Sequence, residues 1–265
     1  MKKLNFIIKY GLALLLLSFY SCESWLNVTP SDRLSEEMLF NDREGFVKAL
    51  NGVYIELNTN ELYGRNLTAG ALDVMGQYYS VASSSHAFYN YGGLVYTGND
   101  EKALFDNMWQ KCYAVIACCN TIIEKCDENK AGLSPVWKGS IKGEALALRA
   151  MLHFDMLRLF GPLTSELDKE SIPYQTNSDQ TVTPLLSGSE VIGLILDDLK
   201  NAVGLLKDTD PYFVEEEFSD TDLNYRRFRM NYFAAKGLMA RVQLWGGDKE
   251  KAAITAKEVI AEGQA

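Results

Sequence analysis

The sequence predicts a mainly helical fold in which paired antiparallel helices alternate with long inserted loops. Apolar residues recur at spacings of three and four over six segments of the 265-residue chain, as they do on one face of an α-helix. Between these segments lie stretches rich in Gly, Ser, Asn and Tyr that lack this period. The chain is 47% hydrophobic with only 6 Pro, an ordinary composition for a globular protein, which excludes disorder.

The N-terminus has the pattern of an export signal. Three lysines precede or border residues 10–20, an uncharged and mostly apolar run (YGLALLLLSFY). A membrane-spanning helix needs about 20 apolar residues, so this run fits the shorter apolar core of a secretory signal peptide. The small residue Ser21 then stands directly before Cys22. We therefore expect a signal peptide over residues 1–21.

The first helix follows an extended tether. We expect residues 22–41 to form this tether, with a short helical turn at residues 35–40 that Ser35 can cap. Asp42 is a suitable N-cap for a helix that runs through residue 57. The apolar residues of that helix fall on one face at spacings of four, three and four: Phe46, Leu50, Val53 and Leu57.

Five further helices are predicted along the chain: residues 102–126, 137–160, 190–206, 231–245 and 249–262. The second of these is apolar on most sides, so it should lie deep in the core, and Gly161 with Pro162 should end it. Ser189 is the expected N-cap of the next helix. The loops cover residues 58–99, 163–188 and 207–229. The first of these loops could include short strands.

The last two helices carry a repeat signal. Large and small residues alternate there at the packing positions of a tetratricopeptide repeat: Met239, Ala240, Ala252, Ala256 and Val259. Small residues at such positions let two antiparallel helices approach closely. Two further pairs, residues 42–57 with 102–126 and residues 137–160 with 189–207, would complete a tetratricopeptide-like helical-hairpin scaffold. Three ordinary helical hairpins without repeat ancestry are the alternative.

The four cysteines after Cys22 are predicted to be free thiols. Cys112, Cys118, Cys119 and Cys126 all fall on one helix. A spacing of seven residues spans ~10.5 Å of helix, which exceeds the ~5.5–6 Å Cα separation that a disulfide prefers. Adjacent Cys118 and Cys119 point to different faces. Because the CxxC or HxxxH spacing of a zinc site is absent, we expect the thiols to be small core residues.

Net charge and missing motifs exclude several functions. The net charge is −9, and because the first 21 residues hold three lysines and no acid, residues 22–265 carry −12. Such a chain does not offer the clustered Lys and Arg that bind nucleic acid or an anionic membrane. It also lacks a Gly-rich phosphate loop, a GxSxG elbow and an HExxH motif. We therefore expect no nucleic-acid partner, no cofactor and no catalytic activity.

Two groups of charged residues have structural interpretations. His153 and Asp155 lie on the predicted core helix, where Arg149 and Arg158 are available as partners. The acidic residues 215–217 are most simply a solvated surface, because their spacing does not match a calcium loop. We expect neither group to form a catalytic or metal site.

An uncharged aromatic segment, residues 74–98, is the candidate binding region. It contains no Asp, Glu, Lys or Arg, although 23% of the chain is charged, and it holds six of the 30 aromatic residues. Aromatic rings stack on the C–H faces of sugars, and neutral side chains hydrogen-bond sugar hydroxyls. The candidate glycan-binding residues are Tyr78, Tyr79, Phe88, Tyr89, Asn90, Tyr91 and Tyr96, with Gln77 and residues 83–85 as further hydrogen-bonding groups.

Tyr89 and Tyr91 are the most testable of these candidates. They are two residues apart, so in an extended loop they would share a face. The flanking Asn90, Gly92 and Gly93 suggest an exposed turn. The alternative is that several rings of the segment pack onto the helices and only hold the loop in place.

Four segments resemble, in their order along the chain, the SusD/RagB family of surface lipoproteins. They are residues 22–30 (CESWLNVTP), 104–120 (beginning LFDNMWQKCY), 143–162 (GEALALRAMLHFDMLRLFGP) and 234–245 (AAKGLMARVQLW). The resemblance implies a tetratricopeptide-like scaffold on the outer membrane of a diderm bacterium. It also implies acylation of Cys22, capture of glycans and their delivery to a SusC-like TonB-dependent transporter. A plain secretory cleavage, with Cys22 incidental, is the alternative at the N-terminus.

The resemblance also implies how the chain is divided. Residues 1–21 would be the lipoprotein signal peptide, residues 22–41 the acylated tether, and residues 42–265 the N-terminal portion of a SusD-like helical domain. Members of the family usually run to about twice this length, so a truncated gene or a fragment without the C-terminal half is expected. The alternative functions are a helical-repeat lipoprotein that docks proteins without a ligand site of its own, or a non-functional fragment.

Overall fold

A computed structural model describes the protein over three stretches, residues 36–179, 181–214 and 217–263. The chain divides into two units, Met1–Leu39 and Phe40–Ala265. In the first unit the described residues form the short helix α3 (Glu36–Leu39), where the sequence predicts a helical turn. Its expected cap Ser35 lies outside the described residues, as do the expected signal peptide and Cys22.

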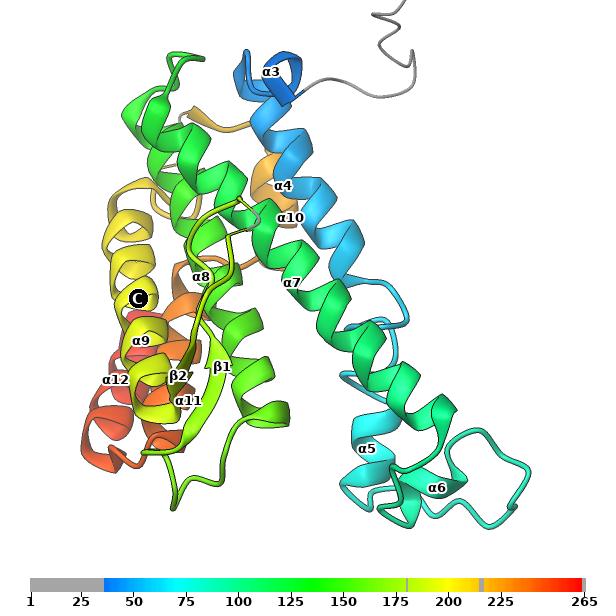
Figure 1. Ribbon diagram of the computed structural model, residues 1–265. Coiled ribbons are helices and arrows are strands. Elements are labelled where there is room, and N and C mark those ends of the chain that lie inside the picture. Colours follow the sequence, from blue (N-terminus) through cyan, green and yellow to red (C-terminus); the bar gives the residue numbers. More distant parts are fainter. Residues whose placement is uncertain (1–35, 180, 215–216, 264–265) are drawn as a thin grey trace, which may run out of the picture. The chain divides into compact units, whose positions relative to one another are not determined.

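The second unit is mainly helical, as predicted (Figure 1). Its helices are α4 (Arg43–Leu57), α5 (Ala71–Met75), α6 (Tyr89–Gly92), α7 (Asn99–Glu128), α8 (Pro135–Phe160), α9 (Gly188–Thr209), α10 (Asp220–Arg226), α11 (Tyr232–Trp245) and α12 (Lys249–Glu262). Two short strands, β1 (Glu170–Pro173) and β2 (Leu185–Ser187), pair antiparallel with Glu170 opposite Ser187. Within the described residues, no helix combines the length and apolarity that a membrane crossing requires.

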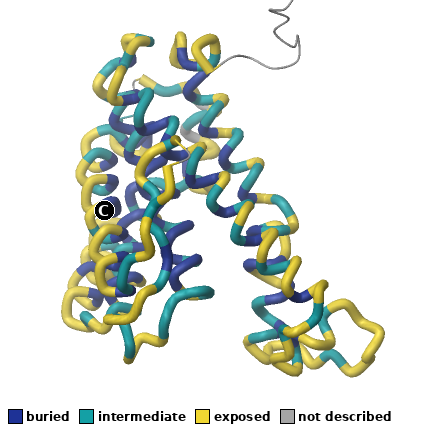
Figure 2. Tube along the Cα trace, in the orientation of Figure 1, coloured by how far each residue is buried: buried dark blue, intermediate teal, exposed yellow. Residues whose placement is uncertain are grey.

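Helix α8 forms the centre of the unit. It packs against α7 and α9 and also contacts α4 and α11, while α4 pairs with α7 and α11 with α12. Figure 2 shows buried residues along α8 and on the faces that its neighbours turn toward it. Helices α8 and α9 lie close together because α8 has glycine where they meet: a Cβ at Gly143 would lie 2.8 Å from Leu206 Cγ. The tetratricopeptide-like arrangement of helical hairpins is confirmed.

The caps of two helices test the sequence signals directly. Asp42 caps α4 as predicted, since its Oδ1 accepts a hydrogen bond from the Gly45 N–H at 2.8 Å. The prediction for α9 is wrong. Ser187 rather than Ser189 is the N-cap, because Glu190 stands three residues after it and completes a capping box. Ser189 instead donates its hydroxyl to the Leu167 carbonyl at 3.1 Å.

The loops contain more regular structure than the sequence predicts. The segment 58–98, which could have included short strands, holds the short helices α5 and α6 and no strand. The segment 163–188, predicted as a loop, contains the strands β1 and β2. The segment 207–229, predicted as an acidic loop, contains α10. Of its acidic residues, Glu217 accepts a hydrogen bond from the Ser134 hydroxyl at 2.8 Å, and residues 215–216 lie outside the described residues.

The four cysteines of α7 are free thiols, as predicted. Cys112, Cys119 and Cys126 are buried in the core, and burial raises the pKa of the Cys126 thiol to about 12. Cys118 is exposed, so the prediction that it is a core residue is wrong. It stands one residue before Cys119, and adjacent helical residues point in different directions.

The packing positions of the last hairpin agree only in part with the repeat pattern. Ala252 is buried against α11, and Met239, Ala240 and Val259 are half-buried. Ala256 is exposed, so its expected role in helix–helix packing is wrong. The buried polar residue Thr255 takes part in the contact instead, since its hydroxyl bonds Gln243 Oε1 at 2.9 Å.

Candidate functional site

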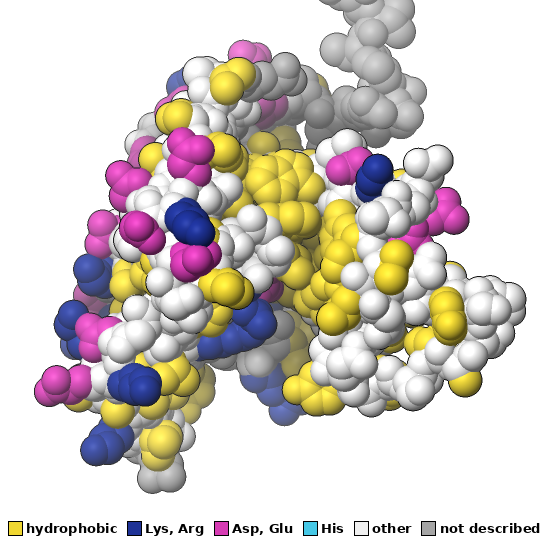
Figure 3. All heavy atoms as spheres, turned by 60° about the horizontal axis from the view of Figure 1, so that its bottom comes forward, with side chains coloured by type: hydrophobic (Ala, Val, Ile, Leu, Met, Phe, Trp, Pro, Cys, Tyr) yellow, Lys and Arg dark blue, Asp and Glu magenta, His cyan; other side chains and the backbone are white. Residues whose placement is uncertain are grey.

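The candidate binding segment lies between α4 and α7, at the end of the unit marked by α5 and α6 (Figure 1). Its buried apolar side chains are Val74 of α5 and Tyr91 of α6. Figure 2 shows that the part before α6 is mostly exposed. In the space-filling view, uncharged side chains dominate this end, whereas charged side chains gather on the left of the view (Figure 3).

Three of the predicted rings face the scaffold. These inner rings, Phe88, Tyr91 and Tyr96, form edge-on or tilted contacts with one another and with Phe105 of α7. The Tyr96 ring centroid lies 5.4 Å from that of Phe105. Phe105 in turn contacts Phe160 of α8 at 6.3 Å. These three rings thus make the packing contacts that the alternative interpretation of the segment expects.

Tyr91 is the centre of the inner cluster. It is 2% exposed, and its hydroxyl donates to the Asp100 carbonyl at 3.4 Å. Burial and the nearby Glu101 and Asp100 raise the pKa of Tyr91. Because the Tyr91 side chain is buried among these contacts, its ring offers no open face on which a ligand could stack.

The expected pairing of Tyr89 with Tyr91 on one face is wrong. Residues 89–92 form a turn of helix, α6, rather than an extended loop. Two residues of helix rotate a side chain by about 200°, so the two tyrosines point to opposite sides. Tyr89 is 43% exposed, whereas Tyr91 is buried.

The remaining three rings face outward. Tyr78, Tyr79 and Tyr89 are 80%, 56% and 43% exposed, and we call them the outer rings. Two of them, Tyr79 and Tyr89, line a cavity of about 400 Å³ that we call the outer cavity. Its lining residues are Gln77, Tyr79, Ser80, Val81, Tyr89, Asn90, Gly92, Gly93 and Val95. None of these side chains is charged, and Tyr78 is not among them.

Two amide side chains of the outer cavity are held in fixed positions. Gln77, whose backbone φ of 62° is left-handed, donates from Nε2 to the Gly92 carbonyl at 3.0 Å. Asn90 donates from Nδ2 to Glu101 Oε1 at 2.8 Å. Both donations leave the amide oxygens without a partner among the described residues. The cavity thus combines two tyrosine rings with two oriented hydrogen-bond acceptors.

Sequence reasoning missed part of this arrangement. Glu101, at the start of α7, is 5% exposed and holds Asn90 in place, but it lies outside the uncharged segment that composition singles out. The predicted serines 83–85 do not line the cavity; Ser83 and Ser85 hydrogen-bond each other at 2.9 Å. The Gly92–Gly93 pair was the available signal for a surface that a ligand can approach closely.

The charged residues of α8 that the sequence singles out have structural partners. His153 Nδ1 bonds the Arg149 carbonyl at 3.0 Å, and its Nε2 accepts the Gln175 N–H at 3.0 Å. Asp155 pairs with Arg158 at 3.0 Å. Burial lowers the pKa of His153 to about 3, so the imidazole is neutral at physiological pH. Within the described residues, no group of three or more His, Cys, Asp or Glu could hold a metal ion.

The sequence matches a known family over most of its length. Residues 24–244 match the SusD-like family described as "Starch-binding associating with outer membrane". The chain belongs to the SusD-like family. The four sequence segments that resemble this family are therefore explained by common descent.

Relatives and solved structures agree with this membership. SusD-like protein P2 of Formosa agariphila is 26% identical over 265 aligned residues, which cover 97% of this chain and 46% of that protein. A SusD-like carbohydrate-binding protein from Bacteroides vulgatus matches 84% of this chain and 45% of its own with a TM-score of 0.67 at 23% identity. A laminarin-binding SusD-like protein matches 83% of this chain and 43% of its own with a TM-score of 0.60 at 16% identity.

At 23% and 16% identity, the two solved structures show that this chain shares their fold. The chain spans less than half the length of the curated relative and of the two structures that it matches.

Proposed function

We propose that this SusD-like chain binds neutral glycans in the outer cavity. The observation that carries the proposal is the division of the aromatic segment into inner rings, which fix it to α7, and outer rings, which line an uncharged cavity. The family description as starch-binding and the laminarin-binding structural neighbour support the same ligand class.

The chemistry of the outer cavity suits a neutral sugar. The Tyr79 and Tyr89 rings offer faces on which sugar C–H groups can stack, and the free amide oxygens of Gln77 and Asn90 can accept sugar hydroxyl protons. Because no lining residue carries a charge, an anionic or cationic glycan would gain no ion pair there. A volume of about 400 Å³ falls within the range of small-molecule sites.

The proposal includes a place and a partner for this activity. Acyl chains on Cys22 would anchor the protein to the outer membrane, facing the cell exterior, since a charge of −12 after residue 21 cannot attract it to anionic lipid. The ligand would then pass to a SusC-like TonB-dependent transporter. The family description, which names association with the outer membrane, supports the location. A Cys22→Ala variant expressed in a diderm host should appear in the soluble fraction, and retention in carbonate-washed membranes would contradict acylation.

The binding test uses the double variant Tyr79→Ala/Tyr89→Ala and soluble laminarin and starch oligosaccharides. If each stack contributes about 0.5–1.5 kcal/mol, as aromatic pairs do, the double change should weaken binding roughly five- to 150-fold. Tyr78→Ala is the matched control, because it removes an exposed tyrosine of the same segment that does not line the cavity. Equal affinity in the double variant and the wild type, with equal melting temperatures, would exclude this site.

A further inference from the structure

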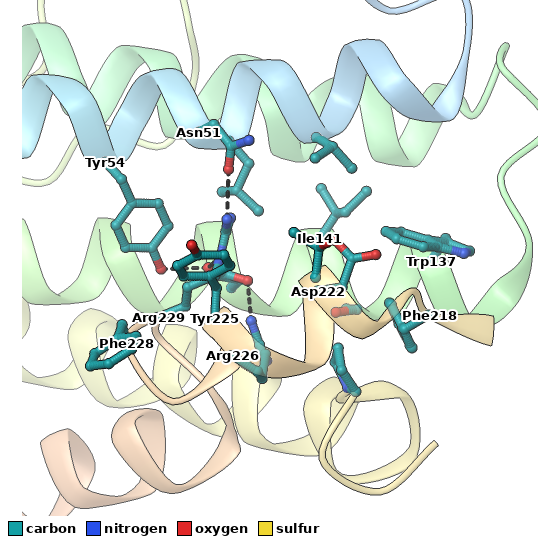
Figure 4. Close-up of a pocket in the computed structure, with 16 residues that line it drawn as sticks. Asn51, Tyr54, Trp137, Ile141, Phe218, Asp222, Tyr225, Arg226, Phe228 and Arg229 are labelled. Atoms are coloured by element: carbon teal, nitrogen blue, oxygen red, sulfur yellow. Dashed lines mark hydrogen bonds and ion pairs between the residues drawn. The ribbon is translucent and has the colours of Figure 1, made fainter. Parts of the chain in front are cut away.

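A larger cavity lies away from the aromatic segment, between the middle of α4 and the N-terminal half of α8 (Figure 4). Its volume is about 500 Å³, and the chain around α10 closes its third side. We call it the α4–α8 cavity. No residue of the segment 58–98 lines it, so the two cavities have no lining residue in common.

Aromatic rings stand at both ends of the α4–α8 cavity. Trp137 and Phe218 lie at one end with their ring centroids 4.5 Å apart, and Tyr54, Tyr225 and Phe228 lie at the other (Figure 4). Tyr225 and Phe228 are largely exposed although they line the cavity. Arginine guanidinium groups lie over the Trp137, Tyr54 and Phe228 rings, at 4.8, 4.6 and 4.8 Å. The exposed Tyr225 ring has no such contact among the described residues, so it is the flat surface open to a ligand.

The floor of the cavity is a fixed network of charged groups. The buried carboxylate of Glu144 accepts hydrogen bonds from the Tyr54 hydroxyl, from Arg226 Nη1 and, at 2.7 Å, from Arg229 Nε. Arg226 also donates to both oxygens of Asp210, at 2.9 and 2.6 Å. Burial and the adjacent Glu144 carboxylate raise the pKa of Tyr54, so that the phenol keeps its proton. The groups that face a ligand are therefore held in place before it arrives.

Several hydrogen-bonding groups of the lining are left open. Ser140 is 5% exposed, and its hydroxyl has no partner among the described residues. Because no fully buried side-chain nitrogen or oxygen of the described residues lacks a partner, this open hydroxyl is one that a molecule in the cavity can reach. Among the described residues, Arg229 donates from Nε and Nη1 and has no partner for Nη2, and Asn51 uses only its oxygen, toward Arg229. Asp222 uses one carboxylate oxygen, in a capping box.

The charges of the lining sum to zero. Glu144 and Asp222 carry two negative charges, and Arg226 and Arg229 carry two positive ones. An anionic ligand would meet two carboxylates. A purely apolar ligand would displace water from the Ser140 hydroxyl and from the Arg229 nitrogen without replacing its hydrogen bonds, which costs free energy. A neutral polyhydroxylated ring would satisfy both the aromatic faces and the open polar groups.

We propose that the α4–α8 cavity is a second carbohydrate site, one that takes one or two rings of a neutral sugar independently of the outer cavity. Tyr225 supplies the stacking face, Trp137 stands at one end of the cavity as a reporter, and Ser140, Asn51 and Arg229 bind the hydroxyl groups. The volume suits a mono- or disaccharide because small-molecule pockets begin at about 300 Å³.

The test monitors the Trp137 side chain by ¹⁹F nuclear magnetic resonance. The full chain is labelled with 5-fluorotryptophan, and its ¹⁹F spectrum is recorded during titration with glucose, galactose, mannose, xylose, maltose, cellobiose and laminaribiose. Trp137→Phe assigns the signal. At least one sugar should shift the Trp137 signal saturably and leave the signals of Trp109 and Trp245, which do not line the cavity, in place.

Two variants make the test specific. Ser140→Ala, which removes only the open hydroxyl, should weaken the sugar titration two- to twelvefold, with unchanged circular dichroism. Tyr79→Ala/Tyr89→Ala removes the two rings of the outer cavity and should leave the Trp137 titration unchanged. Loss of sugar binding at one cavity is therefore measured separately from loss at the other. The proposal is overturned if no sugar shifts the ¹⁹F signal of Trp137, or if only an apolar probe such as indole shifts it. It is also overturned if Ser140→Ala leaves the sugar affinity unchanged, or if the outer-cavity variant abolishes the shift.

Discussion

The α8–α9 core and the aromatic segment 74–98 place their side chains by different rules. In the core, α8, which is buried on most sides, meets α9 at Gly143, and the buried charges of Arg149 and Asp198 pair there. In the segment, rings of one chemical type divide into an inner set that packs and an outer set that lines a cavity. In the segment, aromatic residues of the same type therefore have two roles. Those that point toward α7 fix the segment to the scaffold, and those that point outward form a binding surface.

The largest expected effect concerns the core. Asp198 binds two nitrogens of the buried Arg149, each at 2.7 Å, and the Tyr174 hydroxyl at 2.6 Å. Asp198→Ala would leave a buried guanidinium without its counter-ion, so we expect the free energy of unfolding to fall by about 3–5 kcal/mol, measured by urea titration. The neighbouring Asp197, which pairs with Lys200 on the surface, is the control. Asp197→Ala should change stability by less than about 0.5 kcal/mol, and similar losses for both variants would contradict this account of the core.

The second prediction compares two tyrosines of the segment itself. Tyr91→Ala removes a buried ring and should lower the free energy of unfolding by about 1.5–3 kcal/mol, seen as a lower melting temperature. Tyr89→Ala removes an exposed ring two residues away and should leave stability within about 0.5 kcal/mol of the wild type. A reversed order of the two melting temperatures would show that the inner and outer sets have been assigned wrongly.

The third prediction uses pH to separate the core from the segment. The folded pKa of His153 is about 3, against an ordinary value of 6.5, so between these values the unfolded chain binds a proton that the folded chain does not. Stability from this group is complete above about pH 6.5 and is lost as the pH falls toward 3, at up to about 1.4 kcal/mol per pH unit. Between pH 7 and pH 5 we expect a loss of about 2 kcal/mol.

The control for this titration is His153→Gln. The variant should be less stable at pH 7, because the His153 ring stacks on Tyr174 at 4.0 Å, but its stability should decline less steeply with acid. Parallel pH profiles of the wild type and the variant would show that His153 does not couple folding to protons.

The sequence predicts the helices of this protein better than the roles of its loop residues, for a physical reason. Burial on one face of a helix leaves a period in the sequence, and this locates α4, α7, α8, α9, α11 and α12. Within the segment 74–98, composition marks a ligand-binding surface, but it cannot tell Tyr89 from Tyr91. Their directions depend on the single helical turn of α6 and on Phe105 of α7, which no local pattern in the segment encodes.

The same limit explains the errors at the ends of elements. Ser189 and Ser187 are both plausible caps by type, and the decisive partner is the Glu190 carboxylate, which bonds the Ser187 N–H at 2.9 Å. The α4–α8 cavity could not be predicted at all, since Tyr54, Trp137 and Tyr225 come from three helices or their neighbouring turns and meet only through tertiary packing.

The smallest expected effect would sharpen the comparison at the border between scaffold and segment. Glu101 belongs to α7 but holds Asn90 of the outer cavity by one hydrogen bond of 2.8 Å. Glu101→Ala should leave Asn90 free to rotate and weaken glycan binding by about 0.5–1.5 kcal/mol, or two- to twelvefold, measured by calorimetry with the best oligosaccharide. Asp100→Ala is the matched control, since Asp100 is the exposed neighbouring acid and contributes only its backbone carbonyl to Tyr91. Equal oligosaccharide affinity in the two variants, or wild-type affinity in Glu101→Ala, would contradict this prediction. Asn90 would then not depend on α7 for its position, and the scaffold and the segment would be less closely coupled than the hydrogen bond implies.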